Sequence, residues 1–262
     1  MLLVSLRWIG TVVLLLFFAG QKFISDWPTL RENWMFLVLM GMLGLTAFNG
    51  LFYVAAYTTS ALNIGIIQGS IPVFVLIGSF YLHQARVRKL QVLGIIITLV
   101  GVVIVTSSGS LERLFDLSFQ RGDILMVLAC ILYAGYSIGL QRCPQVNHLS
   151  LFVMFAAGAL AASLPLTLSE VIVGNFQWPT TKGWIIIGLI TLFPSFIAHW
   201  VYIKGVSIIG ASRAGIFFNL VPIFAAIIAV LFLGERFAFY HAVALALVLG
   251  GIAVSEIRKT IL

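Results

Sequence analysis

Four polar side chains interrupt long apolar stretches of this chain: Asn49, Gln68, His199 and Asn219. A polar group is costly to bury in an apolar environment, so such groups usually face a cavity or a hydrogen-bonding partner. All four can form hydrogen bonds without carrying a fixed charge, and a free imidazole pKa near 6.5 makes His199 able to exchange a proton. They are therefore candidates for lining a substrate cavity.

A structural role is the alternative for each of these residues, in which the side chain hydrogen-bonds to a neighbouring helix. We weigh the two roles about evenly for Asn49 and His199, which we expect on opposite sides of one central cavity. The same balance applies to Gln68 and Asn219.

Aromatic residues accompany the polar ones. Tyr53, Trp200 and Tyr202 flank Asn49 or His199 in the sequence, and we expect them to line the same site. A second pair, Tyr133 and Tyr136, is separated by three positions and could share one helix face. Aromatic rings and amides together suit an amphipathic ligand.

Two prolines follow the amides by about one helical turn, Pro72 after Gln68 and Pro222 after Asn219. Proline lacks a backbone donor and clashes with the preceding turn, so it kinks a helix. We expect kinks at both prolines, with unpaired carbonyl groups close to the amides.

Sequence patterns of zinc hydrolysis and dithiol chemistry are absent, since the chain contains no His-Glu-x-x-His and no Cys-x-x-Cys. The spacing Gly-x-Ser-x-Gly occurs at Gly135 to Gly139, but it lies inside an apolar span, whereas the serine nucleophile of this motif needs a strand-to-helix turn. Cys130 and Cys143 are expected to be free thiols. The sequence therefore predicts neither catalytic residues nor a cofactor nor a metal ion.

The elements that carry these residues are apolar segments long enough to cross a bilayer. Hydrophobic residues make up 61% of the chain and charged residues 9%, and the mean hydropathy is +1.14. Since about 20 apolar residues span a membrane, we predict an all-α integral membrane protein with nine spans. They lie near 2–20, 34–56, 62–82, 90–107, 123–141, 149–173, 184–206, 213–233 and 239–256.

A block of the sequence occurs twice at a constant offset of 150 positions. Gly65 corresponds to Gly215, Pro72 to Pro222 and Gly101 to Gly251. Apolar segments match by coincidence, but the residues that interrupt or closely pack helices rarely do. The first repeat is predicted over 1–108 with four helices, and the second over 122–258 with five.

The first repeat is one helix shorter than the second, because the counterpart of the span near 123–141 would precede Met1. Either nine helices are native, or the chain starts late and lacks the first of ten. We favour a missing first helix, since removing one helix from a two-fold arrangement leaves a groove.

An odd number of helices in each full repeat predicts opposite orientations of the two copies in the membrane. The segment 83–90 carries Arg86, Arg88 and Lys89, whereas its counterpart carries Glu235 against Arg236. Basic loops favour the cytoplasm. We therefore assign 83–90 and the C-terminus to the cytoplasmic side, together with Lys22, Arg31, Arg142, Lys204, Arg213, Arg258 and Lys259.

The second repeat carries a family resemblance. The stretch from Gly210 to Ala226, Gly-Ala-Ser-Arg-Ala-Gly-Ile-Phe-Phe-Asn-Leu-Val-Pro-Ile-Phe-Ala-Ala, followed by Phe-Leu-Gly-Glu-Arg, resembles the EamA-like family of the drug/metabolite transporter superfamily. The first copy departs from the pattern, with Gln84-Ala85 where the family usually has Gly-Glu. The resemblance implies ten helices in two inverted halves, and export or exchange of small metabolites across a bacterial inner membrane.

We therefore expect a transporter of amino acids or drug-like metabolites that works by alternating access. A membrane scaffold or regulatory protein of the same fold is the first alternative, and a membrane-embedded enzyme the second. The expected partners are a small-molecule substrate and the lipid bilayer, with a homodimer possible in principle. Nucleic acid is not expected, because the net charge of +7 fits basic loops on one membrane face.

Overall fold

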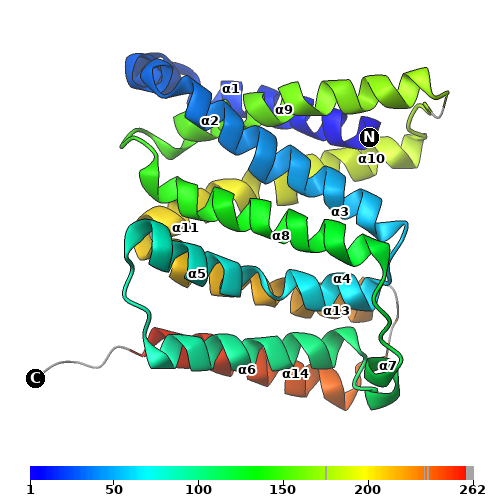
Figure 1. Cartoon of the computed structure of the whole chain (residues 1–262). Coiled ribbons are helices and arrows are strands. Elements are labelled where there is room, and N and C mark those ends of the chain that lie inside the picture. The colour runs from blue at the N-terminus through cyan, green and yellow to red at the C-terminus, as the bar shows by residue number, and fades with distance from the viewer. Residues whose placement is uncertain (175, 233, 235, 258–262) are drawn as a thin grey trace, which may run out of the picture. The chain divides into compact units, whose positions relative to one another are not determined.

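The structure is a computed structural model that describes residues 1–257 except 175, 233 and 235. Glu235, Arg258 and Lys259, which entered the charge argument, lie outside the described residues. Within the described part, the elements are helical and nine helical segments are long and apolar enough to cross a membrane. The predicted all-α membrane class with nine spans is confirmed (Figure 1).

The helices form two compact units, and each unit takes elements from both repeats. Unit 1 comprises residues 1–50 and 135–210, and unit 2 comprises 51–134 and 211–262. The boundary between them falls inside two helices, α3 (Phe48–Ala56) and α8 (Arg121–Gly139).

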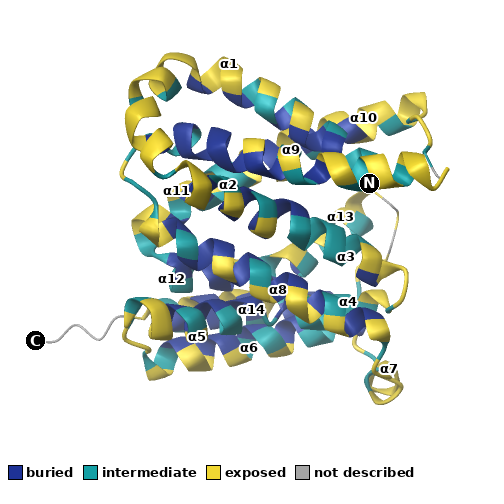
Figure 2. Cartoon of the chain, turned by 45° about the horizontal axis from the view of Figure 1, so that its top comes forward, coloured by how far each residue is buried: buried dark blue, intermediate teal, exposed yellow. Residues whose placement is uncertain are grey.

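Unit 1 is built around α9, which is buried almost all round from Ser150 to Ala159 (dark blue in Figure 2). A helix without a polar face must be enclosed by apolar neighbours or lipid. Helix α9 covers His148–Ile172, and the other elements of the unit are α1 (Leu2–Glu32), α2 (Trp34–Gly41), η1 (Met42–Ala47), η2 (Leu140–Arg142), α10 (Thr181–Ile190), η3 (Thr191–Ile197) and α11 (Ala198–Ile209).

Unit 2 has an apolar core formed by Leu76, Ile95, Ile223 and Val248 with their neighbours. Its elements are α4 (Ala61–Gln68), α5 (Ile71–His83), α6 (Lys89–Thr106), α7 (Leu111–Phe115), α12 (Ala211–Gly215), η4 (Ile216–Leu220), α13 (Val221–Phe232) and α14 (Phe239–Glu256). Large apolar side chains such as Phe80 and Phe232 remain exposed on the surface of this unit, as expected where lipid is the solvent.

The first span is longer than predicted. Instead of ending near residue 20, helical structure continues to Glu32, with a break at Gly20, whose φ is 14° and ψ is −102°. Glycine has no Cβ and tolerates this backbone conformation, so the chain can bend without ending the helix. Lys22 and Arg31 therefore lie on the second arm of α1 rather than in a loop.

Counterparts in the repeat pack against each other with antiparallel axes. In unit 2, α6 runs beside α14 (Figure 1), and their bounds, Lys89–Thr106 and Phe239–Glu256, differ by the offset of 150. A Cβ on Gly251 would lie 2.7 Å from the Gly94 carbonyl oxygen, and one on Gly101 would lie 3.0 Å from the carbonyl oxygen of Ala244. Small residues thus let the two backbones approach closely, which is how helices pack in lipid.

Polar contacts connect the helix ends that were assigned to the cytoplasmic face. In unit 2, Arg88 donates to the carbonyl oxygens of Ser255 and Ile257 at 3.1 and 3.0 Å, and Arg213 forms an ion pair with Glu256. The basic N-terminus of α6 and the C-terminus of α14 therefore share one end of this unit.

Candidate substrate site

The third and eighth spans are discontinuous, and the breaks lie next to the two prolines. In the third span α4 ends at Gln68 and α5 begins at Ile71, so Pro72 stands in the first turn of a new helix. In the eighth span the 3-10 turn η4 precedes Pro222, the second residue of α13. Pro72 starts a helix rather than kinking a continuous one, because the first turn leaves the backbone N–H unused. Pro222 instead follows a 3-10 segment that runs directly into α13.

A cavity of about 570 Å³ opens at these breaks, entirely within unit 2. The amide of Gln68 and the hydroxyl-bearing Thr106 supply its polar side chains, and the rings of Phe52 and Phe218 line it. Glycine and alanine complete much of the wall, and none of the described residues lining it is charged. The size and the sparse polar groups are typical of a small-molecule site.

The repeat explains how this lining arises. Gln68 and Phe218 are counterparts at the offset of 150, so one sequence position supplies an amide in one copy and a ring in the other. Tyr133 packs behind Phe218 with the ring centroids 4.6 Å apart. Phe52, Thr106 and Phe218 were not among the predicted site residues. The only signal for Phe218 was its position as the repeat counterpart of Gln68.

Asn219 does not line this cavity. Its amide nitrogen donates to the Thr98 hydroxyl at 2.7 Å, and the side chain is fully buried. The hydroxyl in turn donates to the Ile95 carbonyl oxygen. The bond to Thr98 links η4 to α6. The structure therefore favours the alternative prediction for Asn219, a hydrogen bond to a neighbouring helix, over ligand binding.

The Ile67 carbonyl at the break accepts several hydrogen bonds, one of them from the backbone N–H of Ser70 at 2.9 Å. The Cys130 side chain donates to the carbonyl oxygen of Ile67 at 3.6 Å, and Ser70 also donates to that oxygen. Buried polar groups need such partners, and here α8 supplies one of them. Cys130 and Cys143 are both free thiols, as predicted.

In unit 1, the two repeats place π-helical segments at equivalent positions. Segment η1 covers Met42–Ala47 and η3 covers Thr191–Ile197. The second residue after each segment bonds back to it, Asn49 to the Leu45 carbonyl at 2.5 Å and His199 Nδ1 to the Pro194 carbonyl at 2.7 Å. Such segments are often found at functional sites in helices. Here the side chains of Asn49 and His199 hydrogen-bond to carbonyl groups within the segments.

The His199 ring sits among aromatic side chains of unit 1. Trp8 contacts it edge-on with the centroids 5.8 Å apart, and Phe152 stacks on it at 6.0 Å. The guanidinium of Arg7 lies over the Trp8 ring, 5.2 Å from its centroid. A buried cation beside aromatic faces is stabilised by their quadrupoles. Trp200 follows on α11 and is half-buried.

The predicted tyrosines have different partners. Tyr202 donates to the Ser137 hydroxyl at 2.8 Å and joins α11 to α8 within unit 1. Tyr136 packs on Phe155 of the same unit with the centroids 5.7 Å apart, whereas Tyr133 belongs to unit 2. Tyr53 lies on the unit 2 portion of α3, where its ring meets Phe52 at 5.8 Å. Tyr133 and Tyr136 both lie on α8, three positions apart, and pack on different rings, Phe218 and Phe155.

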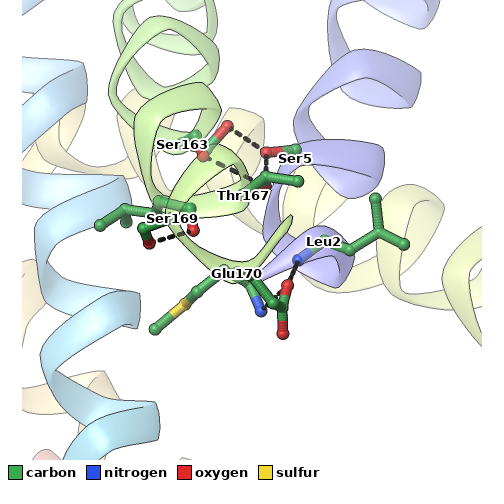
Figure 3. Close-up of polar contacts among 8 residues, drawn as sticks. Leu2, Ser5, Ser163, Thr167, Ser169 and Glu170 are labelled. Atoms are coloured by element: carbon green, nitrogen blue, oxygen red, sulfur yellow. Dashed lines mark hydrogen bonds and ion pairs between the residues drawn. The ribbon is translucent and has the colours of Figure 1, made fainter. Parts of the chain in front are cut away.

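Polar contacts between α1 and α9 hold unit 1 together at another point (Figure 3). The Ser5 hydroxyl bonds to Ser163 at 2.9 Å and to Thr167 at 2.7 Å. One turn further along α9, the Glu170 carboxylate accepts from the backbone N–H of Leu2 at 2.8 Å. The order of these contacts makes α1 and α9 antiparallel, as α6 and α14 are in unit 2.

Comparisons with known proteins agree with this architecture. The EamA-like transporter family matches residues 1–107 and 120–256. The uncharacterized transporter YyaM of Bacillus subtilis is 29% identical over 226 residues, which cover 83% of this chain and 70% of the relative. The uncharacterized inner membrane transporter YedA of Escherichia coli K12 is 26% identical over 268 residues, covering 99% and 82%.

Two more distant similarities bear on fold and function. The aromatic amino acid exporter YddG of Ancylobacter novellus is 21% identical over 228 residues, covering 87% of this chain and 78% of that protein. A crystal structure at 19% identity superposes with a TM-score of 0.81, covering 97% of this chain and 86% of the other, and shows the same fold. With the family matched along both repeats, the chain belongs to the EamA-like transporter family and is a membrane transporter.

Proposed function

We propose that this transporter exports or exchanges small amphipathic metabolites without net charge, with aromatic amino acids as the first class to test. The observation that carries the proposal is the unit 2 cavity, whose described lining combines two phenyl rings, one amide and one hydroxyl without a charged side chain. Rings favour stacking with an aromatic body, and neutral hydrogen-bonding groups favour a zwitterionic or uncharged ligand. The relative named as an aromatic amino acid exporter supports the same class.

In this proposal, backbone groups at the helix ends beside the cavity contribute to binding. The last turn of α4 and the first turn of α13 both border the cavity. Helix ends carry N–H and C=O groups without intrahelical partners, and interrupted helices commonly form transporter binding sites. In this proposal the amino and carboxyl groups of an amino acid bind backbone groups at these helix ends, so the cavity can bind the amino acid without an Arg or Lys side chain.

Alternating access is the proposed mechanism. The two repeats would have opposite orientations, so a change in one copy has a mirrored counterpart in the other. We propose a bacterial inner-membrane location with a cytoplasmic C-terminus, based on the basic residues at 83–90. Coupling to a proton gradient is not part of the proposal, and movement down the substrate gradient accounts for export.

The deciding experiment is a flux measurement on the purified full chain in proteoliposomes. Vesicles are loaded with unlabelled tryptophan, phenylalanine, alanine, lysine or glutamate, and uptake of radiolabelled tryptophan is followed. We expect counterflow with the aromatic amino acids, weaker counterflow with alanine and none with the charged amino acids. Counterflow with every compound, or with the charged ones alone, contradicts the proposed class, and no flux of any compound favours the scaffold alternative.

A further inference from the structure

A second cavity lies in unit 1. It has a volume of about 470 Å³ and is formed by the turn η2, the following loop, the start of α9 and the end of α11. This end of unit 1 also carries Arg142 and Lys204, and the sequence predicts that it faces the cytoplasm. The volume falls in the range of small-molecule sites, about 300–1,000 Å³.

Polar side chains from three elements converge on this cavity. Gln141 and Gln145 contribute amides, and His148 and Ser207 contribute an imidazole and a hydroxyl. His148 Nε2 and the Ser207 oxygen are 2.9 Å apart, so α9 and α11 are joined at the cavity wall. Amide, imidazole and hydroxyl groups can each donate and accept, which suits a ligand with both kinds of polar atom.

Apolar side chains, among them Leu151, Ile203 and Val206, also line the cavity. None of the described residues lining the cavity is Asp, Glu, Lys or Arg. A lining that combines neutral polar groups with apolar side chains fits a molecule with a polar end and an apolar body. It disfavours a polyanion such as a nucleotide, which needs several cationic partners.

The backbone at Gly210 leaves space for one of these polar groups, the Gln141 amide. Its φ of +82° lies in the region that favours glycine, and a Cβ there would lie 3.2 Å from the Gln141 amide nitrogen. A side chain at this position would be strained and would crowd the amide. Glycine thus leaves Gln141 in place beside the cavity.

We infer that this cavity is a second ligand site, which binds small amphipathic molecules without net charge before or after they occupy the unit 2 cavity. The choice of tryptophan as the probe rests on the proposed function, whereas the existence of the site rests on its lining alone. A vestibule of this kind would raise the local concentration of the transported molecule at one membrane face.

Cys143 lines the cavity and can report on its occupancy. In the Cys130→Ala variant of the full chain it is the single cysteine, and its modification by N-ethylmaleimide is timed in detergent with and without tryptophan. At ten times the dissociation constant about one site in eleven stays empty, so we expect modification to slow about tenfold. Lysine and glutamate at the same concentrations are expected to leave the rate unchanged.

Two controls separate occupancy from indirect effects. Ser25→Cys in a Cys130→Ala, Cys143→Ala background places an exposed thiol on α1 outside the cavity lining, and tryptophan should not protect it. Should Cys143 react too slowly to time, Val146→Cys supplies a second thiol in the lining. His148→Ala and Gln145→Ala should each raise the tryptophan concentration needed for protection while leaving the unprotected rate unchanged.

The outcomes distinguish this inference from the proposed function. Protection without tryptophan flux supports the second site and removes the proposed transport of aromatic amino acids. Flux without protection of either thiol, together with unchanged flux in His148→Ala and Gln145→Ala, overturns the second site and leaves the transport proposal standing.

Discussion

The backbones of Gly94 and Gly251 meet across the antiparallel α6–α14 pair, where a Cβ on Gly251 would lie 2.7 Å from the Gly94 carbonyl oxygen. Gly251 is the repeat counterpart of Gly101, and Gly101 approaches Ala244, which is the counterpart of Gly94. Replacing each residue by its repeat counterpart turns the first contact into the second and the second into the first. A two-fold axis perpendicular to the helices produces this pattern, so the pair records an inverted relationship between its two helices.

Gly251→Ala should destabilise the protein by about 1–3 kcal/mol, because the added methyl group overpacks a backbone contact. Thermal unfolding in detergent, followed by loss of the monodisperse peak in size-exclusion chromatography, measures the change. Gly250→Ala is the matched control, since a Cβ at Gly250 meets nothing within 4 Å. The control should be neutral or slightly stabilising through helix propensity, and equal effects of both substitutions would refute the packing argument.

Phe218→Ala should weaken transport of an aromatic substrate, because the ring lines the unit 2 cavity. Stacking is worth about 0.5–1.5 kcal/mol beyond area burial, so the half-saturating concentration should rise by up to about tenfold. Proteoliposome flux at varied substrate concentration gives this number. Phe217→Ala removes a ring that is 43% exposed and outside the lining, and should leave the value unchanged.

Asn219→Ala should reduce stability and leave substrate affinity unchanged. The lost bond to Thr98 lies between helical elements, and interhelical bonds of this kind in membrane proteins contribute about 0.6–1.7 kcal/mol. A double-mutant cycle with Thr98→Ala, read by reversible unfolding, isolates the coupling between the two side chains. A coupling energy near zero, or a raised half-saturating concentration for flux, would return Asn219 to the list of binding residues.

Opposite orientation of the repeats predicts opposite accessibility of two loops. Arg86→Cys and Arg236→Cys, each in a Cys130→Ala, Cys143→Ala background, are labelled in intact cells with a membrane-impermeant maleimide. We expect labelling of the Arg236→Cys protein from outside, and labelling of the Arg86→Cys protein only after the membrane is opened. Labelling of both from the same compartment contradicts the inverted arrangement and with it the proposed mechanism.

The Cys143 thiol should react more readily as pH rises. Burial raises the pKa of Cys143 to about 12, so between pH 7 and 9 the reactive thiolate fraction should increase about tenfold per pH unit. An exposed cysteine, with a pKa near 8.5, approaches a plateau in that interval. Maleimide modification of the Cys130→Ala protein, with Ser25→Cys in the cysteine-free background as the control, measures both profiles; a plateau for Cys143 by pH 9 would show that its thiol is not buried.

Several features followed from the sequence alone. Nine apolar stretches predicted nine spans because a bilayer tolerates backbone only when its hydrogen bonds are internal. Pro72 and Pro222 were predicted to kink their helices; regular α-helical structure does change next to each of them, since proline cannot continue a helix in its usual way. The offset of 150 residues identified which helices would be counterparts, because glycines and prolines coincide by chance far less often than apolar residues do.

Other features depended on tertiary structure. Gln68 and Asn219 look alike in sequence, yet Gln68 faces a cavity and Asn219 bonds to Thr98. Helical periodicity gives the direction of a side chain relative to its own helix but not which neighbour it meets, and that neighbour decides whether an amide is free to bind a ligand. For the same reason, Phe52 and Phe218 could not be selected from the 21 phenylalanines of the sequence. The packing of segments that are distant in the sequence determines which rings line a cavity.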